Sequence, residues 1–125
     1  MKTGIYYKVL SDEGYAYHGG SGRWSLARDG IPGEWMPRIR DLIPCERGYH
    51  VLKPEQLIYW LGPTIHRVEV EEPVLWDGNK GVTHTARDLG RLIEWNPKTQ
   101  RLFGADCAEH VLHLWSAKYP DDDRP

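Results

Sequence analysis

The segment between Gly19 and Gly48 constrains the fold of this chain more than any other, because its apolar residues follow no regular period. It contains three prolines and several glycines, which interrupt helices and central strands. It also contains Trp24, Trp35 and Met36, whose side chains are costly to leave in water. We therefore expect a long ordered loop here, and loops of this length inside a compact domain either carry function or contain a regular element that the pattern does not reveal.

Short strands are predicted on both sides of this loop. Residues Gly4–Leu10 are rich in β-branched and aromatic side chains, which favours a strand. The turn predicted at Ser11–Gly14 is then followed by a returning strand at Tyr15–His18. Further strands are predicted after the loop at Gly48–Leu52, Thr64–Glu71, Pro73–Trp76, Val82–Ala86 and Leu89–Trp95.

Two helices complete the predicted fold. Proline at position 54 favours the first turn of a helix that ends at Gly62-Pro63, and Leu57, Ile58 and Leu61 form its apolar stripe. Asn96-Pro97 predicts the start of a C-terminal helix over residues 97–118, followed by an acidic tail at 119–125. The fold class is therefore α+β, with a largely antiparallel sheet and two helices in a single compact domain of 125 residues.

Composition excludes several classes of protein. Net charge is −2, so no strong field steers the chain towards nucleic acid or a membrane surface. Two cysteines are too few for a disulfide scaffold and lack the spacing of a zinc site. No apolar run is long enough to span a bilayer, so we expect a cytoplasmic protein in a cell or in a phage-infected one.

Two runs anchored by glycine, Tyr17–Gly20 and Gly48–Val51, place a histidine and a tyrosine beside glycine at predicted strand ends. Glycine allows a ligand to approach the backbone, and imidazole and phenol groups can hold a flat polar ring. A histidine in an exposed hairpin, or a buried aromatic residue, would explain the same pattern without a ligand.

Other candidate sites are weaker. Asp106, Glu109, His110 and His113 share one face of the last helix, but solvated side chains explain this spacing better, and we expect no metal. Lys80 follows a turn and could contact a phosphate or be solvated. Arginines between residues 23 and 47 alternate with tryptophans, as in proteins that bind single-stranded nucleic acid, but nearby carboxylates favour a local salt-bridged loop.

The run Pro44–His50, followed by a short helix and by Ile65–Glu71, resembles an uncharacterised bacterial and phage domain with a Cys-x-x-Gly-aromatic-His signature. This resemblance covers most of residues 1–95. The tail from Leu102 to Leu112 is similar to the opening helix of a helical family of proposed immunity proteins. More helices follow in those relatives, so the chain is expected to be a natural short form or a trimmed one.

A His-Gly strand end followed by a glycine-aromatic strand, a helix and a Val-Glu-Val strand also resembles the NAD-binding core of the ADP-ribosyltransferase-like fold. The resemblance implies NAD as cofactor. By position it gives catalytic roles to His18, Tyr49 and His50, and cofactor contacts to Gly19, Gly20 and Trp24. The third element of that fold, a carboxylate that orients the ribose, has no clear match in this sequence.

Two functions of different classes therefore stay open. As an enzyme, the chain would bind NAD between the strands of His18 and His50 and transfer ADP-ribose to a protein or nucleic-acid acceptor. As a non-catalytic interaction module, it would use the Trp24–Trp35 loop to hold a protein partner or a small ligand.

Overall fold

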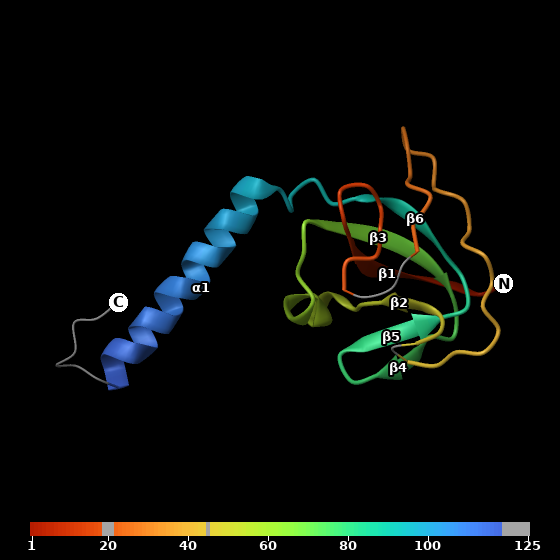
Figure 1. Cartoon of the computed structure of the whole chain (residues 1–125). Coiled ribbons are helices and arrows are strands. Elements are labelled where there is room, and N and C mark those ends of the chain that lie inside the picture. The colour runs from red at the N-terminus through yellow and green to blue at the C-terminus, as the bar shows by residue number, and fades with distance from the viewer. Residues whose placement is uncertain (19–21, 45, 119–125) are drawn as a thin grey trace. The chain divides into compact units, whose positions relative to one another are not determined.

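The structure is a computed structural model that describes residues 1–18, 22–44 and 46–118, with side chains as far as residue 109. Contacts divide the chain into two compact units, Met1–Ile93 and Glu94–Pro125, which we describe separately. The first unit contains two three-stranded antiparallel sheets and a short helix, and the second contains the long helix α1 (Figure 1). The predicted α+β class, with antiparallel sheets and two helices, is confirmed.

The first sheet has the strand order β1-β3-β6. Strand β1 (Thr3–Leu10) pairs along its whole length with β3 (Thr64–Glu71), and β3 pairs on its other side with β6 (Ala86–Arg91). The register of β3 and β6 shifts between Arg67 and Val68, opposite Gly90, whose φ is 130°. This bulge leaves Asp88 opposite Val68, so both residues lie on the inner face.

The second sheet has the order β2-β5-β4, formed by β2 (Tyr49–Val51), β5 (Lys80–Thr83) and β4 (Leu75–Asp77). Only two residues separate β5 from β6, so one stretch of chain passes from the second sheet into the first. The sheets also meet where Tyr7 and Leu52 exchange backbone hydrogen bonds, both of 2.8 Å. These two junctions hold the sheets against each other.

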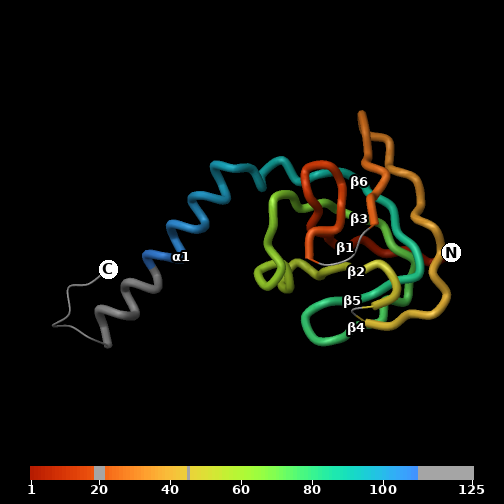
Figure 2. The backbone as a smooth tube through the Cα atoms, in the orientation of Figure 1, coloured from red at the N-terminus to blue at the C-terminus, as the bar shows by residue number. Residues whose placement is uncertain are grey.

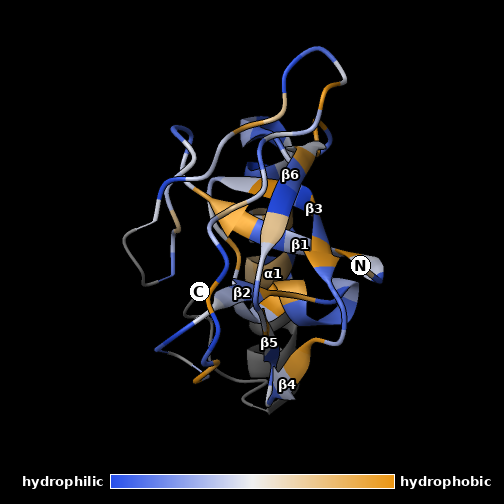
Figure 3. Ribbon diagram, turned by 90° about the vertical axis from the view of Figure 1, so that its right-hand side faces the viewer, coloured by the Kyte–Doolittle hydropathy of each residue, from blue (hydrophilic) through white to orange (hydrophobic). Residues whose placement is uncertain are grey.

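The core lies between the inner faces of the two sheets. Its buried side chains come from β1, β2, β3 and β6 and from Trp24 and Val74. In β3 the buried Val68 and Val70 alternate with Glu69 and Glu71, and Figure 3 shows hydrophobic and hydrophilic stretches along the strands. The alternation arises because successive side chains of a strand point to opposite faces. The fully buried core residues are Leu10, Val51, Val68, Val70 and Ala86.

The long segment before Gly48 contains no named strand, as predicted, but it is ordered by the sheets. Backbone N–H groups of Gly33, Met36 and Ile39 donate to the carbonyl groups of Asp88, Ala86 and His84. In Figure 2 this segment, orange to yellow, runs along one side of both sheets. The sequence did not reveal this pairing, because a hydrogen bond at every third residue does not impose the two-residue alternation of a strand.

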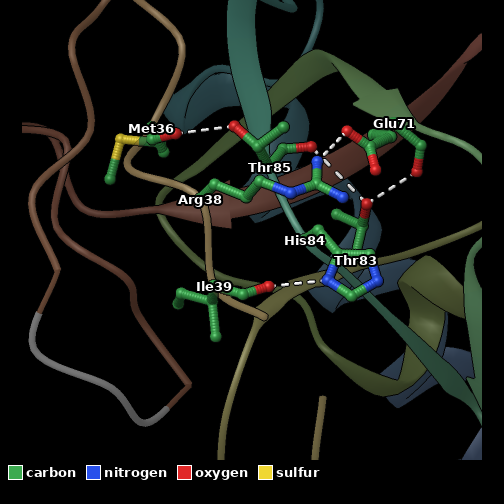
Figure 4. A network of polar contacts seen from close by, with 7 residues as sticks. All are labelled: Met36, Arg38, Ile39, Glu71, Thr83, His84 and Thr85. Carbon is green, nitrogen blue, oxygen red and sulfur yellow. Dashed lines mark hydrogen bonds and ion pairs between the residues drawn. The ribbon is translucent and has the colours of Figure 1, made fainter. Parts of the chain in front are cut away.

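Side chains strengthen the same contact (Figure 4). Thr85 donates its hydroxyl proton to the carbonyl of Met36 at 2.6 Å, and His84 Nδ1 lies 2.6 Å from the carbonyl of Ile39. Arg38 forms an ion pair with Glu71 at the end of β3. The segment is therefore tied both to the β5–β6 connection and to the first sheet.

Some sequence predictions were wrong. Residues Tyr15–His18 form no strand: Gly14, with φ 90°, turns the chain so that Ala16 and Trp24 bond to Gly22 and Gly14. The first helix is the 3₁₀ helix η1 (Pro54–Tyr59), and its predicted apolar stripe is not buried, since Ile58 is 61% exposed. The predicted strand Leu89–Trp95 begins earlier and ends at Arg91.

The second unit contains the helix α1 (Pro97–Lys118), with the bounds predicted from the sequence. Asn96 caps it as expected, because its side-chain oxygen accepts a hydrogen bond of 3.0 Å from the Thr99 N–H group. Trp95 packs edge-on against Phe103, with ring centroids 5.9 Å apart. The predicted acidic tail at 119–125 lies outside the described residues.

Gly48 is expected to be intolerant of a side chain. Its φ is 111°, and a Cβ atom would lie 2.3 Å from Val82 and 2.7 Å from Leu42. We expect Gly48→Ala to lower the free energy of unfolding by roughly 2 kcal/mol or more, through backbone strain and overpacking. Urea denaturation measures this. Gly30→Ala is the matched control, since its φ is 78° but a Cβ would meet nothing within 4 Å; a cost equal to that at Gly48 would refute the packing argument.

Candidate functional site

Lys8 is the most unusual side chain of the first unit. It lies on β1 between Tyr6 and Leu10, on the face that both of these residues turn towards the core. Its ammonium group lies 5.7 Å from the centre of the Trp24 ring, a cation–π contact. Burial, and secondarily the positive charge of Lys80, lower the pKa of Lys8 to about 8.

Lys80, the second cation, begins β5 and is partly buried. Its ammonium group lies 5.0 Å from the centre of the Trp60 ring. The Trp60 indole N–H donates a 3.0 Å hydrogen bond to the carbonyl of Asn79, in the turn before Lys80. This turn therefore positions the indole and the ammonium group together.

His50 joins the two lysines from β2. It pairs directly with Val82, and Lys80 lies two residues before Val82, so His50 and Lys80 share a face of the second sheet. Burial and then the charges of Lys8 and Lys80 lower the pKa of His50 to about 4. At neutral pH the imidazole of His50 is therefore uncharged.

His18 approaches the same place through Trp60. Its Nε2 atom lies 2.6 Å from the carbonyl oxygen of Trp60 and 2.9 Å from that of Leu61. Carbonyl oxygens only accept hydrogen bonds, so Nε2 carries a proton and Nδ1 is the nitrogen left for another partner in the neutral ring. The His18 and Trp60 rings lie 5.6 Å apart, edge to face.

We call Lys8, His18, His50, Trp60 and Lys80 the basic–aromatic cluster. Trp60 contacts both His18 and Lys80. Lys8 and His50 are related to them through the positive charge of Lys80, which contributes to lowering the pKa values of both. Among the described residues, no carboxylate forms an ion pair with either lysine. The cluster thus combines two lysines, two imidazoles and an indole.

Tyr49 and Trp24, the other described candidates from the sequence, lie in the core instead. Tyr49 donates its phenol proton to the carbonyl of Pro37 at 2.5 Å, and its ring packs edge-on against Trp24 at 5.7 Å. Trp24 is only 4% exposed, and its contact with the site is the ammonium group of Lys8. The space beside Gly48, which we expected a ligand to use, is filled by Val82 and Leu42.

Several residues singled out in the sequence lie outside the described part of the chain. These include the predicted cofactor contacts Gly19 and Gly20 and the signature residue Cys45. On α1, Asp106 and Glu109 are exposed, and the side chains of His110 and His113 are not among those described. Within the described residues, no group of three or more His, Cys, Asp or Glu side chains is arranged to hold a metal ion.

A separate cavity of about 620 Å³ lies along residues 23–34. Residues Arg28–Ile31 form a tight turn through Asp29 and Gly30, both with positive φ, which the Asp-Gly pair could have predicted. The cavity walls carry both arginines and carboxylates, so no single charge dominates. We find no feature here that selects a ligand.

His66 and Asp88 form a buried pair at the inner face of the first sheet. His66 Nδ1 lies 2.9 Å from Asp88, which also accepts hydrogen bonds from the N–H groups of Ala27 and Gly90. Burial alone would raise the pKa of Asp88, but these hydrogen bonds more than offset that effect and hold it below its ordinary value. The pair ties the loop to β6 and has a structural role.

Comparisons with known proteins add no relative, since no protein family, curated protein or solved structure matches this chain. No helix in the described residues is both long and apolar enough to cross a membrane. The resemblance to the ADP-ribosyltransferase-like fold therefore remains a prediction from sequence.

The low pKa of His50 predicts a pH-dependent stability. Between about pH 6.5 and pH 4 the unfolded chain binds a proton at this imidazole that the folded chain excludes, so the free energy of unfolding falls as the solution is acidified. His50→Gln is expected to reduce this slope, by about 1 kcal/mol across the interval once solvent screening is allowed for. Urea denaturation at both pH values, with His84→Gln as control, measures it; equal slopes in wild type and His50→Gln would contradict the assignment.

Proposed function

We propose that this chain binds a small phosphorylated ligand at the basic–aromatic cluster. The observation that supports this most is that Lys8, His50 and Lys80 come from three different strands and that their positive charges act on one another, adding to the burial that is the main cause of the lowered pKa values of Lys8 and His50. A phosphate group among them would offset the repulsion and accept charge-assisted hydrogen bonds.

The aromatic members of the cluster favour a ligand that also carries a flat ring. Trp60 lies against both Lys80 and His18, so a ring and a phosphate could be held at neighbouring positions. Nucleotides have both groups, and NAD, the cofactor implied by the sequence resemblance, is one of them. Transfer of ADP-ribose is a further step that would require its own assay.

Titration calorimetry with ADP, NAD, inorganic phosphate and adenosine tests the proposal. We expect heat of binding and a raised unfolding temperature with ADP or NAD, weaker binding with phosphate, and none with adenosine, which lacks the anion. The absence of binding by every phosphorylated compound would refute the proposal. If a pull-down then retained a protein partner, the non-catalytic interaction module would be the better interpretation.

Release of nicotinamide from NAD separately tests ADP-ribosyl transfer. If release occurs, loss of activity in His18→Ala, Tyr49→Ala or His50→Ala would support the catalytic roles that the resemblance implies. Activity that survives all three substitutions would remove these residues from the reaction.

Binding of ADP is expected to weaken as the pH rises from 7 to 9. Lys8 loses its proton near pH 8, whereas the phosphates of ADP are already ionised at pH 7, so only the protein's charge changes. We expect a several-fold loss of affinity, measured by calorimetry in buffers of equal ionic strength. In Lys8→Arg, whose guanidinium stays charged, affinity should be nearly constant over this range; an unchanged slope in this variant would assign the effect to another group.

A further inference from the structure

Part of the backbone of β1 is unpaired at the edge of the first sheet. The strand order β1-β3-β6 gives β1 a full-length partner on one side only. The N–H and C=O groups of Tyr7 point away from β3, because both bond to Leu52. Backbone groups of alternate residues point the same way, so those of Thr3 and Ile5 also point away from β3. No described residue on that side bonds to them, so this part of the edge can accept another strand.

We propose that this edge pairs with the same edge of a second copy of the chain, in a symmetric dimer with the two β1 strands antiparallel. The two-fold axis passes beside Thr3, so the two Thr3 residues lie opposite each other and Met1 of each copy lies opposite Ile5 of the other. The two three-stranded sheets then form one sheet across the dimer. This inference does not depend on the proposed function.

The side chains on the outer face of this edge complement each other in that register. Lys2 continues the pairing of β1, because its carbonyl accepts a 2.8 Å hydrogen bond from the Glu72 N–H group. The alternation of β1 therefore extends to Met1, which shares the outer face with Thr3 and Ile5. Met1 is 76% exposed and Ile5 is 53% exposed. In the dimer each Met1 covers the Ile5 opposite it, so two apolar pairs leave water.

Charged side chains on the inner face are complementary as well. In this register Lys2 lies opposite Gly4 of the other copy. The Glu72 carboxylate lies over Gly4, where a Cβ atom would collide with its Oε1, and the Tyr6 hydroxyl donates a 3.0 Å hydrogen bond to the same oxygen. Among the described residues, neither Lys2 nor Glu72 forms an ion pair within its own chain. Each ammonium group can therefore pair with the carboxylate of the other copy.

A second copy fits this edge better than an arbitrary extended peptide. The free edge is short, since Leu52 occupies it at Tyr7, so few backbone hydrogen bonds are available and side chains must contribute. A second copy offers Met1, Lys2 and Ile5 at the required spacing, and symmetry provides each contact twice. Because the interface is small, we expect a weak dimer that forms at about 0.1 to 1 mM protein.

Sedimentation equilibrium of the full chain, from about 10 μM to 1 mM, tests the inference. We expect the apparent mass to rise from that of the monomer towards twice that value. Ile5→Lys should stay monomeric, because it brings a cation to the edge and removes the apolar pair. Ile31→Lys is the matched control, since Ile31 is 69% exposed in the turn at residues 28–31, and it should dimerise like the wild type. A wild-type chain that stays monomeric at 1 mM would overturn the dimer, also if the edge accepts a strand of another protein.

A charge exchange tests the register itself. Lys2→Glu and Glu72→Lys should each dimerise at least tenfold more weakly than the wild type, because each variant places like charges opposite each other twice. An equimolar mixture of the two variants should recover the dimer, since both contacts then join opposite charges. Damage to the fold would not be rescued by mixing. Two variants that dimerise like the wild type, or a mixture no heavier than its components, would overturn this register.

Discussion

Lys8→Met is expected to weaken ADP binding by roughly 10- to 100-fold, the loss typical of a removed charge-assisted hydrogen bond. It should also leave the free energy of unfolding unchanged or higher, because it removes a poorly solvated cation that Lys80 repels. Calorimetry and urea denaturation measure the two quantities on the same preparation. A loss of ADP affinity without a loss of the free energy of unfolding would indicate that Lys8 serves ligand binding rather than folding.

Lys53→Met is the matched control for this prediction. The Lys53 ammonium group also lies over an indole, 4.3 Å from the centre of the Trp76 ring, but it belongs to a different pair. We expect this variant to bind ADP like the wild type. If both variants lose affinity equally, general surface charge rather than the basic–aromatic cluster binds the ligand.

Asp88→Ala is expected to lower the free energy of unfolding by about 3 to 5 kcal/mol, the range for breaking a buried charged pair. Asp88 is only 1% exposed, and its carboxylate accepts hydrogen bonds from His66, Ala27 and Gly90. Removing it leaves three donors without this acceptor and releases the loop from β6. Because its pKa is lowered on folding from 3.8, its stabilising contribution is present above that pH and is lost as the pH falls through the lower folded value.

Two further variants test this account. Asp88→Asn keeps the shape and one acceptor oxygen, so it should lose less stability than Asp88→Ala and allows a measurement if the alanine variant does not fold. Asp12→Ala removes an exposed carboxylate 3.7 Å from Arg91 and should change stability by less than about 0.5 kcal/mol. Equal effects at positions 12 and 88 would contradict a special role for the buried pair.

Local patterns predicted the regular elements well. Thr64–Glu71 and the helix at 97–118 have the predicted bounds, because β-branched alternation and an asparagine cap act within a few residues. The strand predicted at Tyr15–His18 was wrong, since Gly14 and Gly22 direct this segment to nearby backbone groups instead. The long-range hydrogen bonds of residues 33–39 to residues 84–88 left no local pattern to detect.

The candidate site was only partly predictable. His18, His50 and Lys80 were all singled out in the sequence, but nothing there indicated that Trp60 connects them. Lys8 was missed because it belongs to a strand with apolar or aromatic residues on both faces, so the sequence does not tell which face meets the core. Conversely, Tyr49 and Trp24 have side chains typical of a binding site, yet they pack against each other.

The pairing of β1 with β3 also has a consequence for synthesis of the chain. Thr3 pairs with Glu71 and Leu10 with Thr64, so β1 leaves the ribosome well before its partner β3 and has no partner until much of the chain has followed it. Contacts between residues so far apart in sequence slow folding, because the intervening loop must close first. We therefore expect β1 to stay unpaired during translation until β3 has been synthesised. Because β6 completes this sheet, we expect the first unit to fold only after β6 has left the ribosome.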